Sequence, residues 1–262
     1  MTFQPVVPLS GYGGWRFLNR TIEAQKDTFA ESGSIQRQMD YFRDNIGSIK
    51  SAEDLVNDRQ LLSVALDAFG LSEDINAKAF IQKVLDDGTL DSSALSSKLS
   101  DKRYAALSKA FGFGDFDTPR TQLSYFADEV LEKFVDRSFE VAVGNVDHDM
   151  RLALNLSDAL TEIADNASSN RAQWFGVMGN TAVRAVFDGA LGLPDSFGSL
   201  DIDKQLETYL DRSERVFGTD TVADFSDPDL QEQLIRTYLI RASIGQVDPT
   251  TSGAVALSLL QS

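Results

Sequence analysis

One helix ending occurs three times along this chain, and it constrains the fold more than any other feature. A small residue, a large apolar residue, a glycine and a second large apolar residue follow one another at 68–71, 110–113 and 190–193. Glycine adopts the left-handed conformation that ends a helix without a steric penalty. Twelve residues before each glycine stands a residue type that caps helix starts, namely Asp58, Ser100 and Asn180. The pattern predicts three short helices with both ends specified.

Each of these segments also carries one apolar face at helical spacing. After each glycine, we expect the apolar residue to fold back on the last turn, which pairs Leu71 with Leu66, Phe113 with Leu107 and Leu193 with Phe187. The glycines are 42 and then 80 residues apart, close to one and two steps of a helical repeat. We therefore expect internally repeated helix units, although no clear copy occurs near residue 150.

Helical patterns account for most of the remaining chain. Apolar residues recur every three or four positions on both sides of a break at 32–34, and further helices are expected near 75–86, 91–99, 119–142, 150–166, 171–179, 203–217 and 228–243. The best alternating segment, 139–143, is too short to indicate a sheet. The predicted fold class is all-α, a multi-helix bundle or irregular helical array.

The organisation follows from breaks in this pattern. Residues 1–14 contain two prolines and a glycine-rich stretch, which predicts an irregular N-terminal arm. Residues 15–248 form the all-helical part, either as one domain or as two subdomains of about 15–118 and 119–248. Residues 249–262 are a C-terminal tail, whose apolar end we expect to pack on the fold itself.

The first helical segment presents a narrow apolar seam. Trp15, Leu18, Ile22 and Phe29 follow a three-to-four spacing, with Gln25 as one polar lapse. Such a seam normally packs on the core of its own protein. The alternative is that this helix docks on another protein or on a second copy of the chain.

Composition narrows the functions that are open to the chain. It has no cysteine and one histidine among 262 residues, so disulfides and thiolate chemistry are excluded. The net charge of −16 argues against nucleic acid and anionic membranes as partners. Neither a membrane span nor a secretory signal is visible, which predicts a cytoplasmic protein; export by a route without a cleaved signal stays open. Residues 195–232 hold 11 acidic and 3 basic side chains, which indicates a solvated acidic face or a docking surface for a basic partner.

No motif indicates catalysis, a cofactor or a metal. The one histidine stands in Asp147-His148-Asp149, which has the residue types of a helix start rather than of a catalytic dyad. The loop around Gly88 lacks the ligand spacing of a calcium site, and the stretch 11–14 lacks the context of a phosphate cradle. Trp174-Phe175 is interpreted as core rather than as a ligand platform. We therefore assign no catalytic, cofactor-binding or metal-binding residue.

Two longer stretches carry a resemblance. The run 39–46 leading into 53–62 and the first helix ending, together with 174–194 and 201–205, resembles an uncharacterised alphaproteobacterial family, domain of unknown function 1217. Members of that family tend to be encoded among flagellar genes. The resemblance implies an association with flagellar assembly or its regulation. Our first hypothesis is therefore a non-enzymatic helical interaction or scaffold protein tied to that process. The alternatives are an enzyme or small-molecule binder with an Asp, Glu or Arg site between helices, and a flagellar export chaperone or secreted axial component.

Overall fold

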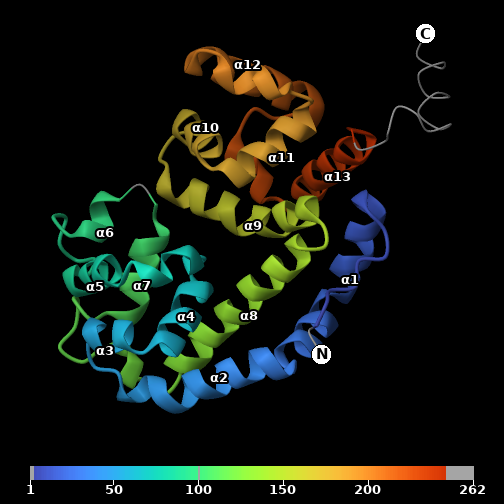
Figure 1. Cartoon of the computed structure of the whole chain (residues 1–262). Helices are drawn as coiled ribbons and strands as arrows, with labels where there is room; N and C mark the ends of the chain where they lie inside the picture. The colour runs from blue at the N-terminus through green and yellow to red at the C-terminus, as the bar shows by residue number, and fades with distance from the viewer. Residues whose placement is uncertain (1–2, 100, 246–262) are drawn as a thin grey trace, which may run out of the picture. The chain divides into compact units, whose positions relative to one another are not determined.

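The computed structural model describes residues 3–99 and 101–245, and these residues form helices joined by short loops (Figure 1). The described residues contain 13 α-helices and no strand, which confirms the all-α class. The segment 139–143 lies inside a helix. The bounds are α1 Gly11–Ala30, α2 Gly33–Asn45, α3 Ala52–Asn57, α4 Arg59–Ala68, α5 Lys78–Asp87, α6 Leu95–Lys98, α7 Arg103–Phe111, α8 Phe126–Gly144, α9 His148–Asn166, α10 Asn170–Gly179, α11 Thr181–Leu191, α12 Ile202–Phe217 and α13 Pro228–Gly245. Short 3-10 turns link several of them.

The three predicted glycine endings are present. Gly70, Gly112 and Gly192 have φ of +69°, +68° and +64°, which only glycine adopts without strain. Behind two of them the chain folds back, because the Leu71 N–H donates to the Leu66 carbonyl at 2.8 Å and the Leu193 N–H donates to the Asp188 carbonyl at 2.9 Å.

Two of the three predicted caps are confirmed. The Asp58 carboxylate accepts the N–H groups of Gln60 and Leu61, both at 3.0 Å, and the Asn180 side chain accepts two N–H groups at 3.1 and 3.2 Å. Ser100 lies outside the described residues. The prediction of internally repeated units is not confirmed: α4 packs on α2 and α3, α7 on α5 and α6, and α11 on α9 and α13. Similar ends therefore serve helices in unrelated surroundings.

The chain divides into two compact units, each assembled from two stretches of sequence. The first unit comprises the described residues of 1–5 and 21–142, and the second unit those of 6–20 and 143–262. The sequence instead placed an optional boundary near residue 118. The division between residues 142 and 143 falls within α8, which runs without interruption from Phe126 to Gly144. The predicted arm of 1–14 was too long, since α1 begins at Gly11. The predicted tail of 249–262 lies outside the described residues.

The core of the first unit is built from the apolar faces of its short helices. Phe42 of α2, Leu55 of α3, Leu61 of α4 and Phe111 of α7 are each fully buried there. The Phe111 ring meets the Phe126 ring edge to face at 5.1 Å between centroids, which joins α7 to α8.

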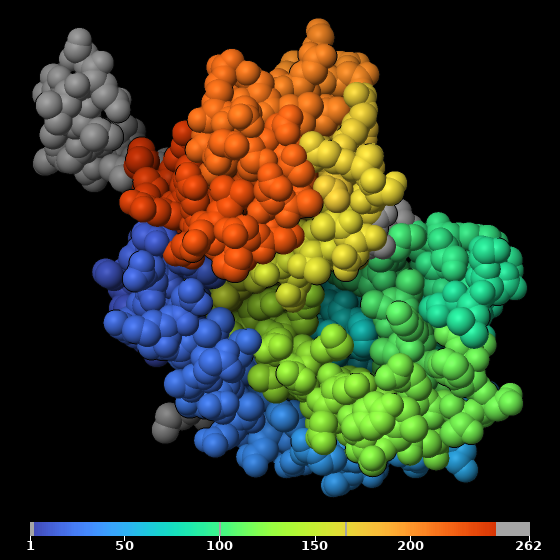
Figure 2. All heavy atoms as spheres, turned by 180° about the vertical axis from the view of Figure 1, so that it is seen from behind, coloured from blue at the N-terminus to red at the C-terminus, as the bar shows by residue number. Residues whose placement is uncertain are grey.

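The core of the second unit is centred on Trp174 of α10. Its ring stacks on Tyr209 and meets Phe187 edge to face, both at 5.3 Å between centroids. Its indole N–H donates to the Asp220 carbonyl at 2.7 Å, which satisfies the one polar atom of the side chain. The interpretation of Trp174 as core is confirmed. Figure 2 shows the side chains of α12 and α13, in orange and red, packed against one another on one face.

The seam on α1 is part of the protein's own interior. Trp15, Leu18 and Phe29 are 5%, 0% and 6% exposed, and Trp15 belongs to the core of the second unit. The buried face of α1 is therefore occupied, and any partner of α1 must contact its outer face. None of the helices in the described part of the chain has the length and hydropathy needed to cross a bilayer.

Candidate functional site

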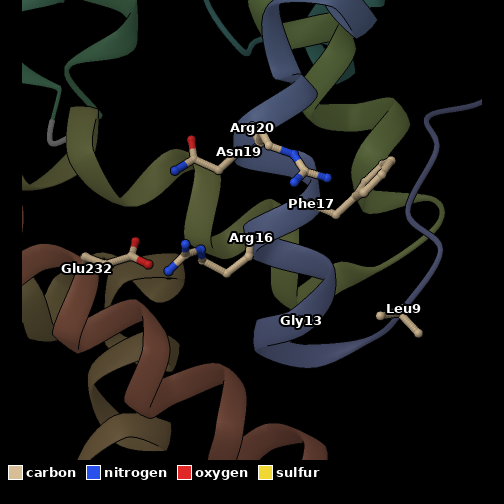
Figure 3. Close-up of a pocket in the computed structure, with 7 residues that line it drawn as sticks. All are labelled: Leu9, Gly13, Arg16, Phe17, Asn19, Arg20 and Glu232. Carbon is tan, nitrogen blue, oxygen red and sulfur yellow. The ribbon is translucent and has the colours of Figure 1, made fainter.

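A groove of about 620 Å³ lies in the second unit along the outer face of α1 (Figure 3). Its position on α1 follows from helical spacing, since 13, 16, 17 and 20 share one face of the helix. In Figure 3, Arg16 extends toward Glu232 of α13, whereas Arg20 extends to the other side, toward Phe17. The lining residues are Leu9, Gly13, Arg16, Phe17, Asn19, Arg20 and Glu232.

A close crossing of the chain places Leu9 at the edge of the groove. A Cβ on Gly14 would lie 1.8 Å from the Leu9 carbonyl oxygen and 2.4 Å from Cε of Met150, so only glycine fits at that position. The loop before α1 is thereby pressed onto the first turn of the helix. Leu9 is left 63% exposed, so it offers apolar surface at the edge of the groove.

Glu232 anchors the groove to α13. Its carboxylate accepts hydrogen bonds from the Tyr12 hydroxyl at 2.8 Å and from the Trp15 indole N–H at 3.1 Å. The Arg236 guanidinium lies over the Tyr12 ring, 5.6 Å from its centroid. These contacts hold the first turns of α1 against α13, with one hydrogen bond to each carboxylate oxygen of Glu232.

The two arginines give the groove a positive rim in a protein of strongly negative charge. The pKa of Arg16 is raised, first by its hydrogen bond with Tyr12 and also by the negative charge of Glu232. The Arg20 guanidinium lies 5.8 Å from the centroid of the Phe17 ring. Arginine binds carboxylates through paired N–H groups, and Leu9 and Phe17 add apolar surface beside them. The arrangement therefore suits an anionic ligand that also carries apolar groups.

The triplet around the one histidine, which the sequence analysis considered as a site, serves the fold. Asp147 caps α9 by accepting the Met150 N–H at 3.1 Å, and Asp149 accepts the Tyr238 hydroxyl at 2.5 Å. The interpretation of this histidine-containing triplet as a helix start is confirmed. Within the part of the chain that the structure describes, no three His, Asp or Glu side chains are placed to share a metal ion.

The acidic stretch 195–232 also performs structural work. Asp201 caps α12 by accepting the Asp203 N–H at 3.0 Å, and Asp227 caps α13 through two N–H groups at 3.0 and 3.1 Å. Pro228 follows as the first residue of α13, as the sequence predicted. Part of the acidic excess is thus explained by helix starts, where negative charge is favoured.

Sequence reasoning did not identify the groove. Arg16 and Glu232 lie far apart in the chain, and no motif links them. The one available signal was the segment 16–50, whose small positive balance contrasts with the acidic remainder. That balance gave no position, because six basic residues are spread over several helical turns.

Comparison with known proteins places the chain in a family. A family model described as "Protein of unknown function (DUF1217)" matches residues 68–230, which leaves the residues of the groove outside the matched range. A crystal structure of a protein from Agrobacterium tumefaciens, solved in a structural genomics programme, is similar at 26% identity with a TM-score of 0.72, and the match covers 93% of this chain and 99% of that one. No curated protein matches the chain. The chain belongs to the DUF1217 family.

Proposed function

We propose that this chain is a non-enzymatic helical protein that binds other proteins, in connection with flagellar assembly or its regulation. The observation that carries the proposal is the groove on α1, in which Arg16 and Arg20 stand beside apolar surface on an open face. Enzyme sites are normally concave and largely enclosed, whereas a segment of another protein binds to an open surface of this kind. The flagellar connection rests on the resemblance to a family whose members tend to be encoded among flagellar genes.

The test is affinity purification of the tagged chain at its native level, with mass spectrometry of the proteins that accompany it. We expect flagellar export or basal-body proteins in the eluate. The same purification with an Arg16→Ala/Arg20→Ala variant separates specific from adventitious capture, because this variant removes the positive rim and leaves the buried face of α1 intact. Arg37→Ala, an exposed arginine of α2, is the matched control.

An eluate that lacks flagellar proteins contradicts the flagellar part of the proposal. Equal recovery of the same proteins by the double variant contradicts the use of the groove. Fractionation of cells then distinguishes a cytoplasmic binding protein from an export chaperone or a secreted axial component, since the last of these would be found outside the cell.

A further inference from the structure

Two adjacent glycines in α1 have different reasons to be glycine. Gly14 is required by the fold, because a side chain there would collide with the Leu9 backbone and with Met150. A Cβ on Gly13 would meet only Cδ1 of Leu9 at 3.6 Å, an ordinary van der Waals distance. The fold of the second unit would accept alanine at position 13, and alanine is the better helix former.

The position of Gly13 points to a use outside the chain's own packing. It is exposed and lines the groove, between Leu9 on one side and Arg16 and Phe17 one turn further along α1. A helix can approach another helix more closely where a residue without a side chain lies at the contact. The missing side chain therefore makes a low point on the outer face of α1, with apolar and cationic groups around it.

We propose that this groove binds an acidic amphipathic helix of a partner protein, packed closely over Gly13. An apolar residue of the partner lies between Leu9 and Phe17, and carboxylates of the partner pair with Arg16 and Arg20. Glu232 keeps its negative charge while it accepts two hydrogen bonds from this chain, but the lining holds Arg16 and Arg20 against this one acid, so its net charge favours the partner's carboxylates. The inference rests on the proposed protein-binding function and adds the chemistry of the partner.

The probe for the test is a synthetic helical peptide of about 20 residues, long enough to hold a helix in water. It carries leucine along one face and glutamate along both borders of that face. The control peptide replaces every glutamate with glutamine. Binding to the full chain is followed by fluorescence anisotropy, and thermal unfolding of each variant is recorded beside it.

We expect the glutamate peptide to bind and the glutamine peptide to bind at least about tenfold more weakly, because charge pairs are lost. Arg16→Ala/Arg20→Ala should lower the affinity for the glutamate peptide by about the same factor. Gly13→Leu should lower the affinity for both peptides by about tenfold, because its side chain fills the low point on the outer face of α1. Gly179→Ala, a substitution at an open position in α10, should leave the affinity for both peptides unchanged.

The stability readout separates this role from a merely structural one. Gly13→Ala should keep or raise the midpoint of thermal unfolding while it lowers the affinity for the glutamate peptide. The inference is overturned if both peptides bind with the same affinity and if the substitutions at Arg16, Arg20 and Gly13 leave that affinity unchanged. A second result also overturns it: phosphatidylglycerol vesicles bind, their binding requires both arginines, and the peptide does not bind. The groove would then recognise a membrane surface.

The outcome is distinguishable from that of the proposed function. If flagellar proteins are captured but the glutamate peptide does not bind, the inference of an acidic helical partner is contradicted and the proposed protein-binding function is still supported. Charge-dependent peptide binding without flagellar proteins in the eluate supports the acidic helix and contradicts the flagellar connection.

Discussion

Five of the six tyrosines of this protein donate their hydroxyl to a carboxylate. The pairs are Tyr12 with Glu232, Tyr41 with Asp58, Tyr104 with Asp74, Tyr209 with Asp188, and Tyr238 with Asp149. Each pair satisfies the polar end of an aromatic side chain and supplies a donor to an acid. In a protein with 40 acidic and 24 basic residues, tyrosine thus adds to the hydrogen-bond donors that the acids receive.

The pair in the core of the second unit gives a first prediction. Tyr209 is fully buried and its partner Asp188 is also held by Arg184 Nε at 3.2 Å. Tyr209→Phe should lower the free energy of unfolding by about 1–2 kcal/mol, because a half-buried carboxylate loses a donor. Urea unfolding measures this loss. Tyr125→Phe is the matched control, since Tyr125 is 50% exposed, and equal losses in both variants would contradict the argument.

Tyr104 gives a prediction about alkaline stability. Burial raises the pKa of Tyr104 to about 12, with its hydrogen bond to Asp74 as the second cause. The folded pKa lies above the value of about 10 for an unfolded tyrosine, so this contribution is present below pH 10 and is lost as the pH rises to 12. The stability difference between the wild type and Tyr104→Phe should therefore shrink over that window. A difference that stays constant from pH 8 to pH 12 would count against it.

The helix ends were predictable from the sequence because their chemistry is local. A cap and a glycine ending depend on residues within four or five positions, and Asp58, Asn180 and the three glycines behave as expected. The predicted helix of 119–142 shows the limit of this reasoning. Its apolar stripe continues through Phe126 and Phe134, but Leu123 has an extended backbone, and α8 begins only at Phe126.

The groove could not be predicted because no local rule specifies it. It needs a loop crossing at Gly14 and a carboxylate that lies 217 residues beyond Trp15. Contacts over such separations are set by packing rather than by a sequence pattern. The sequence could show that α1 was amphipathic, but not what its polar face would meet.

The two confirmed caps should differ in their energetic weight. Asp58 caps α4 and also accepts the Tyr41 hydroxyl at 2.8 Å, which ties α4 to α2, whereas the Asn180 side chain accepts two N–H groups of its own helix. Asn180→Ala should cost about 1 kcal/mol, and Asp58→Ala should cost about 1 kcal/mol more. Chemical denaturation of both variants checks the order. The double variant Tyr41→Phe/Asp58→Ala should have a free energy of unfolding within a few tenths of a kcal/mol of that of Asp58→Ala, because the hydrogen bond between these two residues is already lost in the single variant.

The charge of the protein predicts how its stability responds to salt. With a net charge of −16, the folded state carries self-repulsion that mobile ions screen. Sodium chloride should raise the midpoint of thermal unfolding between about 10 and 300 mM, because the Debye length falls to about 10 Å at 0.1 M. Sucrose, which acts by exclusion and not by screening, serves as the control. A midpoint that falls over this range would contradict the argument.

The division of the chain into two units has a spectroscopic consequence. Both tryptophans, Trp15 and Trp174, belong to the core of the second unit, although 159 positions separate them in the sequence. The first unit contains Tyr41, Tyr104 and Tyr125 but no tryptophan. Indole emission therefore monitors the second unit by itself, while far-ultraviolet circular dichroism records helices of both. Melting curves from the two signals will coincide if the units unfold together and will separate if one unfolds first.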